Sequence, residues 1–81
     1  MPEKEMDVKR LVILGGYKVK EYNHCKSLAQ SAYQEGKTDD FFEWSKKSQK
    51  YAIQIDTLGE VADIIGFMGY DEYMELIHSE E

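Results

Sequence analysis

Residues 38–66, TDDFFEWSKKSQKYAIQIDTLGEVADIIG, place apolar or small side chains at alternating steps of four and three. The row with this spacing is Phe41, Ser45, Ser48, Ala52, Ile55, Gly59, Ala62, Gly66. Beside it, at steps of seven, lie Trp44, Tyr51, Leu58, Ile65. Such spacing is typical of an amphipathic helix, sustained here for about seven turns. Residue types that cap helices stand at its start, namely Thr38, Asp39 and Asp40. Because Asp40 and Glu43 also have capping-box spacing, we predict a helix over residues 39–67.

The first half of the chain has a less regular apolar pattern, which also fits a helix. Gly36 stands where glycine is preferred, just beyond a helix C-terminus, so we expect a helix over residues 5–35 and a turn over residues 36–38. The pair Gly15-Gly16 costs about 2 kcal/mol relative to two alanines inside a helix. The pair is therefore a bend or a point of close contact. An alternative makes Arg10 to Leu14 a strand followed by a glycine turn.

A third amphipathic segment follows Gly69. Asp71 is placed to cap a short helix over residues 71–78 with four apolar residues on one side: Tyr70, Tyr73, Met74 and Ile77. The expected fold is all-α, a single domain over residues 1–81 in which two long antiparallel helices form a hairpin and a short C-terminal helix follows. A turn near Lys37 pairs positions whose numbers sum to about 74, which brings Lys18 near Asp56.

Charge is divided unevenly along the chain. All ten Lys and Arg residues lie at or before Lys50, whereas residues 51–81 have eight carboxylates and no Lys or Arg. A net charge of −6 argues against direct nucleic-acid binding, whose affinity comes mainly from neutralising phosphates. The longest purely apolar run, Leu11 to Leu14, is far shorter than the roughly twenty residues that cross a bilayer, so we expect no membrane segment. A single cysteine, Cys25, excludes an internal disulfide framework and favours a cytoplasmic protein.

Reactive or metal-binding groups are sparse. His24 and Cys25 are neighbours and would point about 100° apart on a helix, so they cannot chelate one metal together. A zinc site needs further Cys or His ligands beyond the distant His78. We therefore predict no catalytic, cofactor or metal site, and a protein that is not an enzyme.

Residues 28–48 resemble one helical hairpin of the tetratricopeptide family. The residues that match its pattern are Leu28, Ala29, Tyr33, Gly36, Asp39, Phe41, Trp44 and Ser48. The match covers about a quarter of the chain, and a second copy is absent, although a repeat fold needs about three. The resemblance implies a tight helix-turn-helix that binds other proteins.

Both long segments have apolar residues on more than one stripe, so a bare hairpin would leave apolar surface uncovered. We therefore expect a homodimer that forms a helical bundle and regulates or inhibits a larger protein partner with a basic or apolar groove. The expected partner-binding residues are Phe67, Met68, Tyr70, Asp71, Glu72, Tyr73, Met74, Glu75 and Ile77.

Two other functions remain open. The first is an acidic inhibitor of the phage type that imitates nucleic acid and blocks a DNA- or RNA-binding enzyme. The second is a small DNA-binding regulator that uses the neighbouring Lys46, Lys47 and Lys50.

Overall fold

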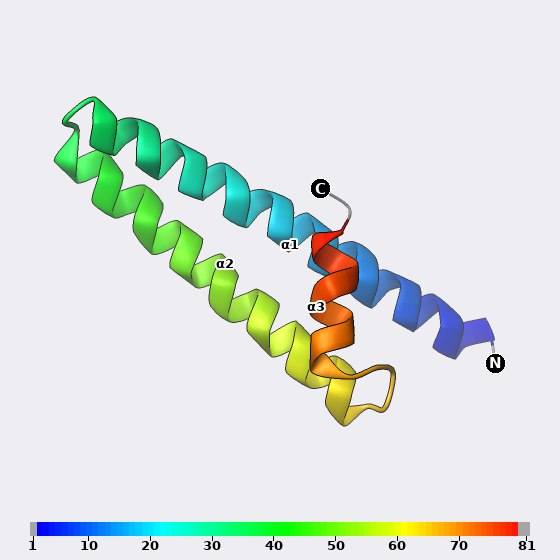
Figure 1. Cartoon of the computed structure of the whole chain (residues 1–81). Helices are drawn as coiled ribbons and strands as arrows, with labels where there is room; N and C mark the ends of the chain where they lie inside the picture. The colour runs from blue at the N-terminus through cyan, green and yellow to red at the C-terminus, as the bar shows by residue number, and fades with distance from the viewer. Residues whose placement is uncertain (1, 80–81) are drawn as a thin grey trace.

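The computed structural model describes the backbone of residues 2–79 and side chains from residue 9 onward. Its three helices are α1 (Pro2–Gln34), α2 (Thr38–Ile64) and α3 (Tyr70–His78). The two long helices form an antiparallel hairpin and the short one packs against both, which confirms the predicted all-α fold (Figure 1). The molecule is elongated, with extents of 52 × 19 × 18 Å. Met1, Glu80 and Glu81 of the predicted domain lie outside the described residues.

Helix α1 runs without a break through Gly15 and Gly16. The alternative strand over residues Arg10 to Leu14 is therefore wrong, because these residues are helical and have no sheet partner in the described chain. The helix stops as the glycine signal predicts. Gly36 adopts a φ of 75°, and the N–H groups of Gly36 and Lys37 donate to the carbonyls of Tyr33 and Ala32. This hydrogen-bond pair is the Schellman motif that glycine favours at a helix end.

Helix α2 begins at Thr38, one residue before the predicted start, and the predicted side-chain cap is wrong. Lys37 occupies the N-cap position, and no side-chain hydrogen bond caps the helix. The turn is so tight that Asp39 and Asp40 already lie in the first helical turn. There their charges complement the positive end of the helix dipole, which is the part of the sequence argument that holds.

Helix α2 ends at Ile64, three residues earlier than predicted. Gly66 has a φ of 75°, and its N–H donates to the carbonyl of Asp63 while that of Phe67 donates to Ala62. Gly66 therefore ends the helix in a second Schellman motif, although its spacing made it look like the last member of the small-residue row.

Helix α3 begins at Tyr70, one residue before the predicted start, and ends at His78, as predicted. Gly69 is its N-cap residue, with no side-chain hydrogen bond, so the cap predicted at Asp71 is wrong. Asp71 and Glu72 instead lie in the first turn, where negative charge is favourable.

The register of the hairpin follows the predicted sum of about 74. The rings of Tyr33 and Phe41 lie 5.4 Å apart beside the turn, and Val19 and Ile55 share the core. The expected contact of Lys18 with Asp56 is wrong. Lys18 lies over the ring of Tyr51 on one side of the hairpin, whereas the carboxylate of Asp56 points to the other side and accepts a hydrogen bond from α3.

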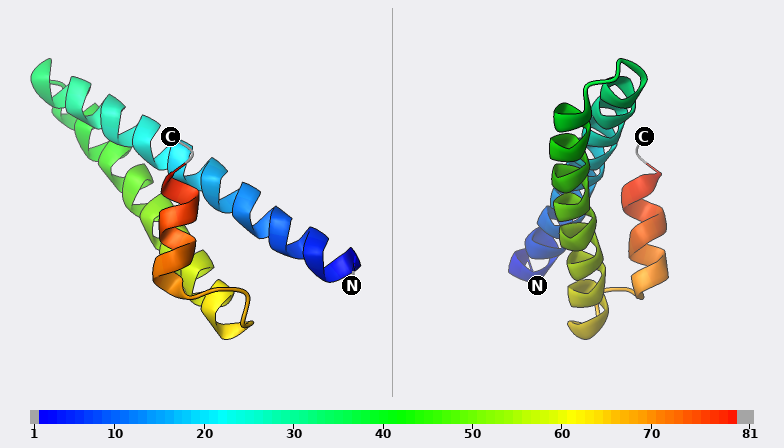
Figure 2. Two further views of the ribbon diagram at one scale, coloured as in Figure 1. Left: turned by 45° about the vertical axis from the view of Figure 1, so that its right-hand side comes forward. Right: turned by 90° about the vertical axis from the view of Figure 1, so that its left-hand side faces the viewer.

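The two long helices lie close together near the turn and diverge toward the other end, here called the open end (Figures 1 and 2). Helix α3 lies across this wider part, on one side of the plane of the hairpin (Figure 2). We call the side covered by α3 the front face and the opposite side the back face. The core lies where all three helices meet, and its fully described buried members are Val19, Ile55, Ala62, Tyr73 and Ile77.

Candidate functional site

The apolar members of the predicted partner-binding segment face their own chain. Tyr73 and Ile77 are 0% and 1% exposed. The remaining apolar members are half-buried, and these are Phe67, Met68, Tyr70 and Met74. Only the acidic members are fully open to solvent, and these are Asp71, Glu72 and Glu75. The acidic side chains of the segment are thus available to a partner, whereas its apolar side chains pack against the core of the same chain.

Tyr73 fixes α3 to the first helix. Its hydroxyl donates a hydrogen bond of 2.6 Å to the carbonyl oxygen of Leu11, and burial raises the pKa of this hydroxyl. The ring reaches that carbonyl because Gly15 has no side chain. A Cβ at Gly15 would lie 2.7 Å from Cγ2 of Ile77 and closer still to the Tyr73 hydroxyl. The glycine pair is therefore a point of close contact, one of the two readings that the sequence allows.

Gly59 allows α3 to pack closely against α2, the other long helix. A Cβ at Gly59 would lie 2.7 Å from Cδ2 of Tyr70. The hydroxyl of Tyr70 donates to the carboxylate of Asp56, and this hydrogen bond raises the pKa of the tyrosine. Among the side chains of residues 9–79, the hydrogen-bond partner of Asp56 is thus a tyrosine and not a lysine of α1.

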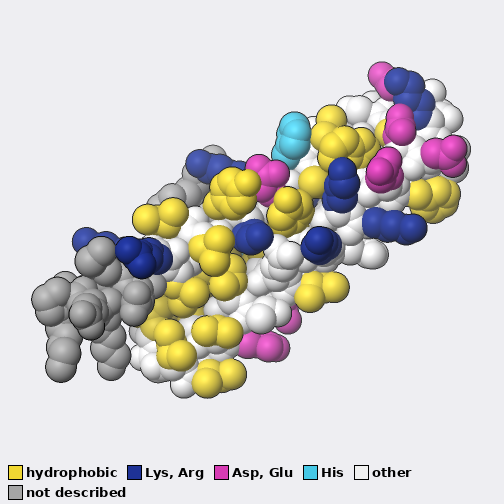
Figure 3. All heavy atoms as spheres, turned by 180° about the vertical axis from the view of Figure 1, so that it is seen from behind, with side chains coloured by type: hydrophobic (Ala, Val, Ile, Leu, Met, Phe, Trp, Pro, Cys, Tyr) yellow, Lys and Arg dark blue, Asp and Glu magenta, His cyan; other side chains and the backbone are white. Residues whose placement is uncertain are grey.

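Large apolar side chains are exposed toward the open end of the two long helices. Those that we call the apolar patch are Leu14 (43% exposed), Val61 (38%), Ile64 (81%) and Ile65 (57%). Leu14 on α1 and Val61 on α2 are at about the same level of the hairpin, since their numbers sum to 75. Figure 3 shows hydrophobic side chains gathered over this end of the back face. Contiguous exposed apolar surface of this kind marks interaction sites.

Farther along the back face, toward the turn, lies a cavity of about 460 Å³ between the two long helices. Three lysines and two aromatic rings line this cavity, which we call the lysine groove. These five residues are Lys18, Lys47, Lys50, Trp44 and Tyr51, and the other lining residues are Glu21, His24, Cys25 and Gln54. The lysine groove adjoins the apolar patch on both helices. On α1, Lys18 of the groove is one turn from Leu14 of the patch. On α2, Gln54 of the groove is two turns from Val61 of the patch. Figure 3 shows basic side chains over the middle of this face.

Cations and rings are paired inside the lysine groove. Nζ of Lys47 lies 4.6 Å from the ring centroid of Trp44, and Nζ of Lys18 lies 5.4 Å from that of Tyr51. Burial, and then the nearby charge of Glu21, raise the pKa of Tyr51. Oε1 of Gln54 is buried without a hydrogen-bond partner in the wall of the groove. The position of Lys46 is exposed and outside this lining.

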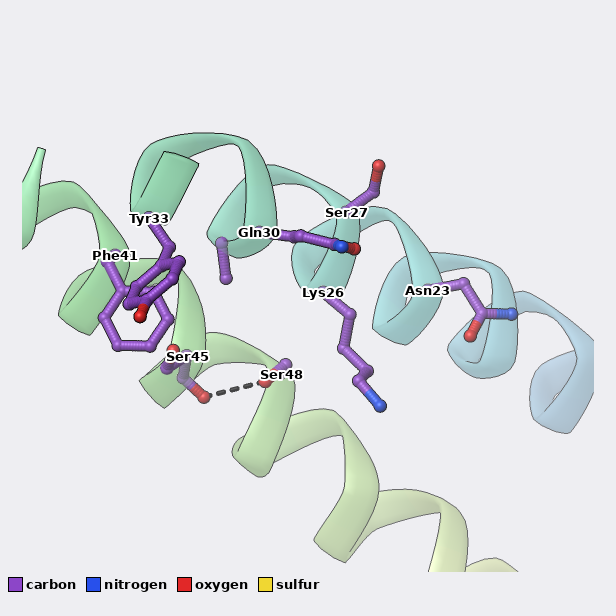
Figure 4. Close-up of a pocket in the computed structure, with 9 residues that line it drawn as sticks. Asn23, Lys26, Ser27, Gln30, Tyr33, Phe41, Ser45 and Ser48 are labelled. Atoms are coloured by element: carbon purple, nitrogen blue, oxygen red, sulfur yellow. Dashed lines mark hydrogen bonds between the residues drawn. The ribbon is translucent and has the colours of Figure 1, made fainter. Parts of the chain in front are cut away.

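The front face has its own hollow beyond the end of α3, of about 640 Å³ (Figure 4). The aromatic pair of Tyr33 and Phe41 stands at one end, and Ser45 and Ser48 line its α2 side. The hydroxyl of Ser48 donates to the carbonyl of Ser45, so this side chain is already satisfied within its own helix. The hollow is broad, shallow and nearly neutral, with Lys26 as its only charged lining residue among those described.

The histidines and the cysteine stay apart. His24 is exposed on α1, Cys25 is 3% exposed beneath the lysine groove, and His78 stands at the end of α3 with Nδ1 2.7 Å from the carbonyl oxygen of Met74. Among the side chains of residues 9–79, no three His, Cys, Asp or Glu residues are grouped to hold a metal ion. Within the part of the chain that the structure describes, none of the helices has the length and apolar character needed to cross a bilayer.

No protein-family model, curated protein or solved structure matches this chain. The candidate sites therefore rest on geometry alone. The sequence missed the apolar patch because Ile65 and Leu14 sit in stripes that look like core, and Ile64 lies outside the stripes altogether. It indicated Lys47 and Lys50 as neighbours, but only the folded hairpin adds Lys18 to them from the other helix.

Proposed function

We propose that this chain is a protein–protein interaction module that forms a homodimer through the apolar patch and regulates a larger partner. The observation that supports the proposal is the exposure of Ile64 and Ile65, at 81% and 57%, near Val61 on α2, with Leu14 exposed on the other long helix. A chain of 81 residues buries only about 60–65% of its unfolded surface, so covering this patch adds stability that the isolated chain lacks. A cytoplasmic location, supported by the lone cysteine, belongs to the same proposal.

Charge around the apolar patch favours a second copy as its occupant. Arg10 lies one turn before Leu14 on α1, whereas Glu60 lies one turn before Ile64 on α2. When two copies meet with α1 of one against α2 of the other, each basic edge faces an acidic edge. Such complementarity sets the orientation of the pair, while the burial of apolar side chains supplies the affinity.

Replacing Ile64 by lysine is expected to convert the dimer to monomer at micromolar concentration. A two-fold interface loses this side chain twice, and a buried isoleucine contributes about 1.5–3 kcal/mol at each place. At 81% exposure Ile64 adds little to the fold of one chain, so the helix content measured by circular dichroism should stay unchanged. Size-exclusion chromatography with light scattering measures the mass.

The matched control is Ile53→Lys, because Ile53 is 68% exposed on the same helix but lies three turns away from the apolar patch. This variant should remain dimeric. If Ile64→Lys and wild type have the same dimeric mass, or if both isoleucine variants dissociate equally, the assignment of the interface is wrong.

An acidic nucleic-acid mimic is the second candidate, and one observation favours it. Asp56, Glu60 and Asp63 form no ion pair with the described lysines of α1, and they are exposed, as are the acidic residues of α3. A mimic should displace duplex DNA from a nonspecific DNA-binding protein, and changing these three residues and Glu75 to amides should abolish the displacement. Gel-shift competition measures the effect. Displacement that survives the four changes, or none by the wild type, would reject this candidate.

A further inference from the structure

The lysine groove concentrates positive charge that the chain does not neutralise. Lys47 and Lys50 are one turn apart on α2, and Lys18 faces them from α1. Within residues 9–79 none of the three forms an ion pair, since the one described pair joins Lys37 to Glu35. Like charges held close together repel one another, so their grouping over one groove costs stability in the free chain.

The surroundings of these lysines are those of a binding site and not of a plain solvated surface. The volume of the lysine groove, about 460 Å³, lies within the usual range for ligand sites of roughly 300–1,000 Å³. Trp44 and Tyr51 give it half-buried aromatic walls. A bound group would therefore meet positive charge and apolar surface together.

The shape of the lysine groove fits an extended segment. Its lining on α2 runs from Trp44 to Gln54, which are ten residues apart and so about 15 Å along the helix. An extended peptide rises about 3.3 Å per residue, so four or five residues fill that length. The open top of the groove suits a chain that enters and leaves.

The net charge of −6 does not prevent an anion from binding here. The acidic row of α3 is on the front face, separated from the lysine groove by the thickness of the hairpin. Exposed charges farther apart than about 8 Å are largely screened at physiological ionic strength. Inside the groove a ligand meets three lysines and one carboxylate, that of Glu21.

We propose that the lysine groove binds an acidic peptide segment of four or five residues in extended conformation. Its carboxylates pair with Lys18, Lys47 and Lys50, and an apolar side chain among them packs against Trp44 and Tyr51. This site is distinct from the homodimer contact at the apolar patch. It gives the dimer two places, one on each copy, that select partners by an acidic sequence.

The test uses the full-length chain and the synthetic peptide acetyl-Glu-Glu-Ile-Glu-Glu-amide, with acetyl-Gln-Gln-Ile-Gln-Gln-amide as its neutral counterpart. Trp44 is the single tryptophan of the chain, so its fluorescence reports on the lysine groove directly. The acidic peptide should shift this fluorescence in a saturable way, and the neutral peptide should not. Replacing Lys47 and Lys50 together by alanine should weaken binding about tenfold, as the loss of two partly exposed ion pairs implies. Because Lys47 contacts the indole, fluorescence anisotropy of a labelled peptide should give the same affinity change.

The matched control is Lys20→Ala with Lys26→Ala, which removes the same charge from α1 outside the groove lining. This variant should bind the acidic peptide as the wild type does. An equal loss in both double variants would mean that net charge alone attracts the peptide, and the inference would fail. Absence of any saturable response would also overturn it, as would binding of tripolyphosphate at the same lysines without binding of the peptide, which would make the groove an inorganic polyanion site.

Discussion

Replacing Tyr73 by alanine is expected to lower the free energy of unfolding by about 3–5 kcal/mol, the usual cost of removing a fully buried aromatic ring. Tyr73 is 0% exposed and fills the space between the diverging long helices. Its loss leaves a cavity and also leaves the carbonyl of Leu11 without the hydroxyl that now donates to it. A domain of this size has a total stability of roughly 4–12 kcal/mol, so the variant should be unfolded or close to it at 37 °C. Urea denaturation followed by circular dichroism measures the change.

Tyr73→Phe separates the ring from its hydroxyl. It keeps the packing and removes one hydrogen bond, so the expected loss is about 1 kcal/mol. Replacing the more exposed Leu76 of the same helix by alanine should cost less than Tyr73→Ala, because Leu76 is 38% exposed. If Tyr73→Ala lowers stability by no more than Leu76→Ala does, α3 is not held by this side chain and the description of the core is wrong.

Replacing Gly15 by alanine is expected to destabilise the protein although alanine favours helix. The exchange gains about 1 kcal/mol of helix propensity. The new methyl group, however, would overlap the Tyr73 hydroxyl and Cγ2 of Ile77, both on buried side chains with no room to move. Overpacking of this kind costs about 1–3 kcal/mol, so the two opposing terms leave a net loss in most of that range. Thermal and urea unfolding measure the sign.

The cost should shrink when Tyr73 is absent. In the Tyr73→Ala background only Cγ2 of Ile77 still overlaps the new methyl group, so Gly15→Ala should be less destabilising there than in the otherwise unchanged protein. Ser31→Ala, at an exposed position of the same helix, serves as the control for propensity alone and should be neutral or slightly stabilising in both backgrounds. A stabilising Gly15→Ala in the otherwise unchanged protein would contradict the close contact between α1 and α3.

The hairpin was predictable because its signals are local. The spacing of apolar residues in α2 and the glycine at position 36 each follow from the chain within one or two turns, and the structure confirms both. Helix starts were predicted less well. Asp39 and Asp71 have the right side chains for caps, but the preceding turns are so tight that both lie inside the first helical turn. Side-chain type cannot show how tight a turn is.

The proposed interaction surface was the part that the sequence could not place. The pattern around Tyr73 and Ile77 shows that one side of α3 needs apolar cover, but it does not say whether the cover comes from the same chain or from a partner. The cover comes from the same chain, because Gly15 and Gly59 allow α3 to pack closely against both long helices. Helix α3 covers only part of the long helices, so large apolar side chains such as Ile64 and Ile65 stay exposed.

The lysine groove likewise could not be predicted without the folded structure. Lys47 and Lys50 are near each other in any helix, but Lys18 joins them only through the antiparallel register. The sequence suggested nucleic acid as the target of these lysines. We propose an acidic peptide instead of nucleic acid, because the groove is short and combines lysines with aromatic walls.

The central claim is that a second copy covers the apolar patch, and the mass of the wild-type protein in solution tests it most directly. Sedimentation equilibrium at micromolar concentration should give about 18.8 kDa, twice the 9.4 kDa of one chain. A mass of 9.4 kDa across this range would contradict the claim and leave the apolar patch without the occupant proposed for it.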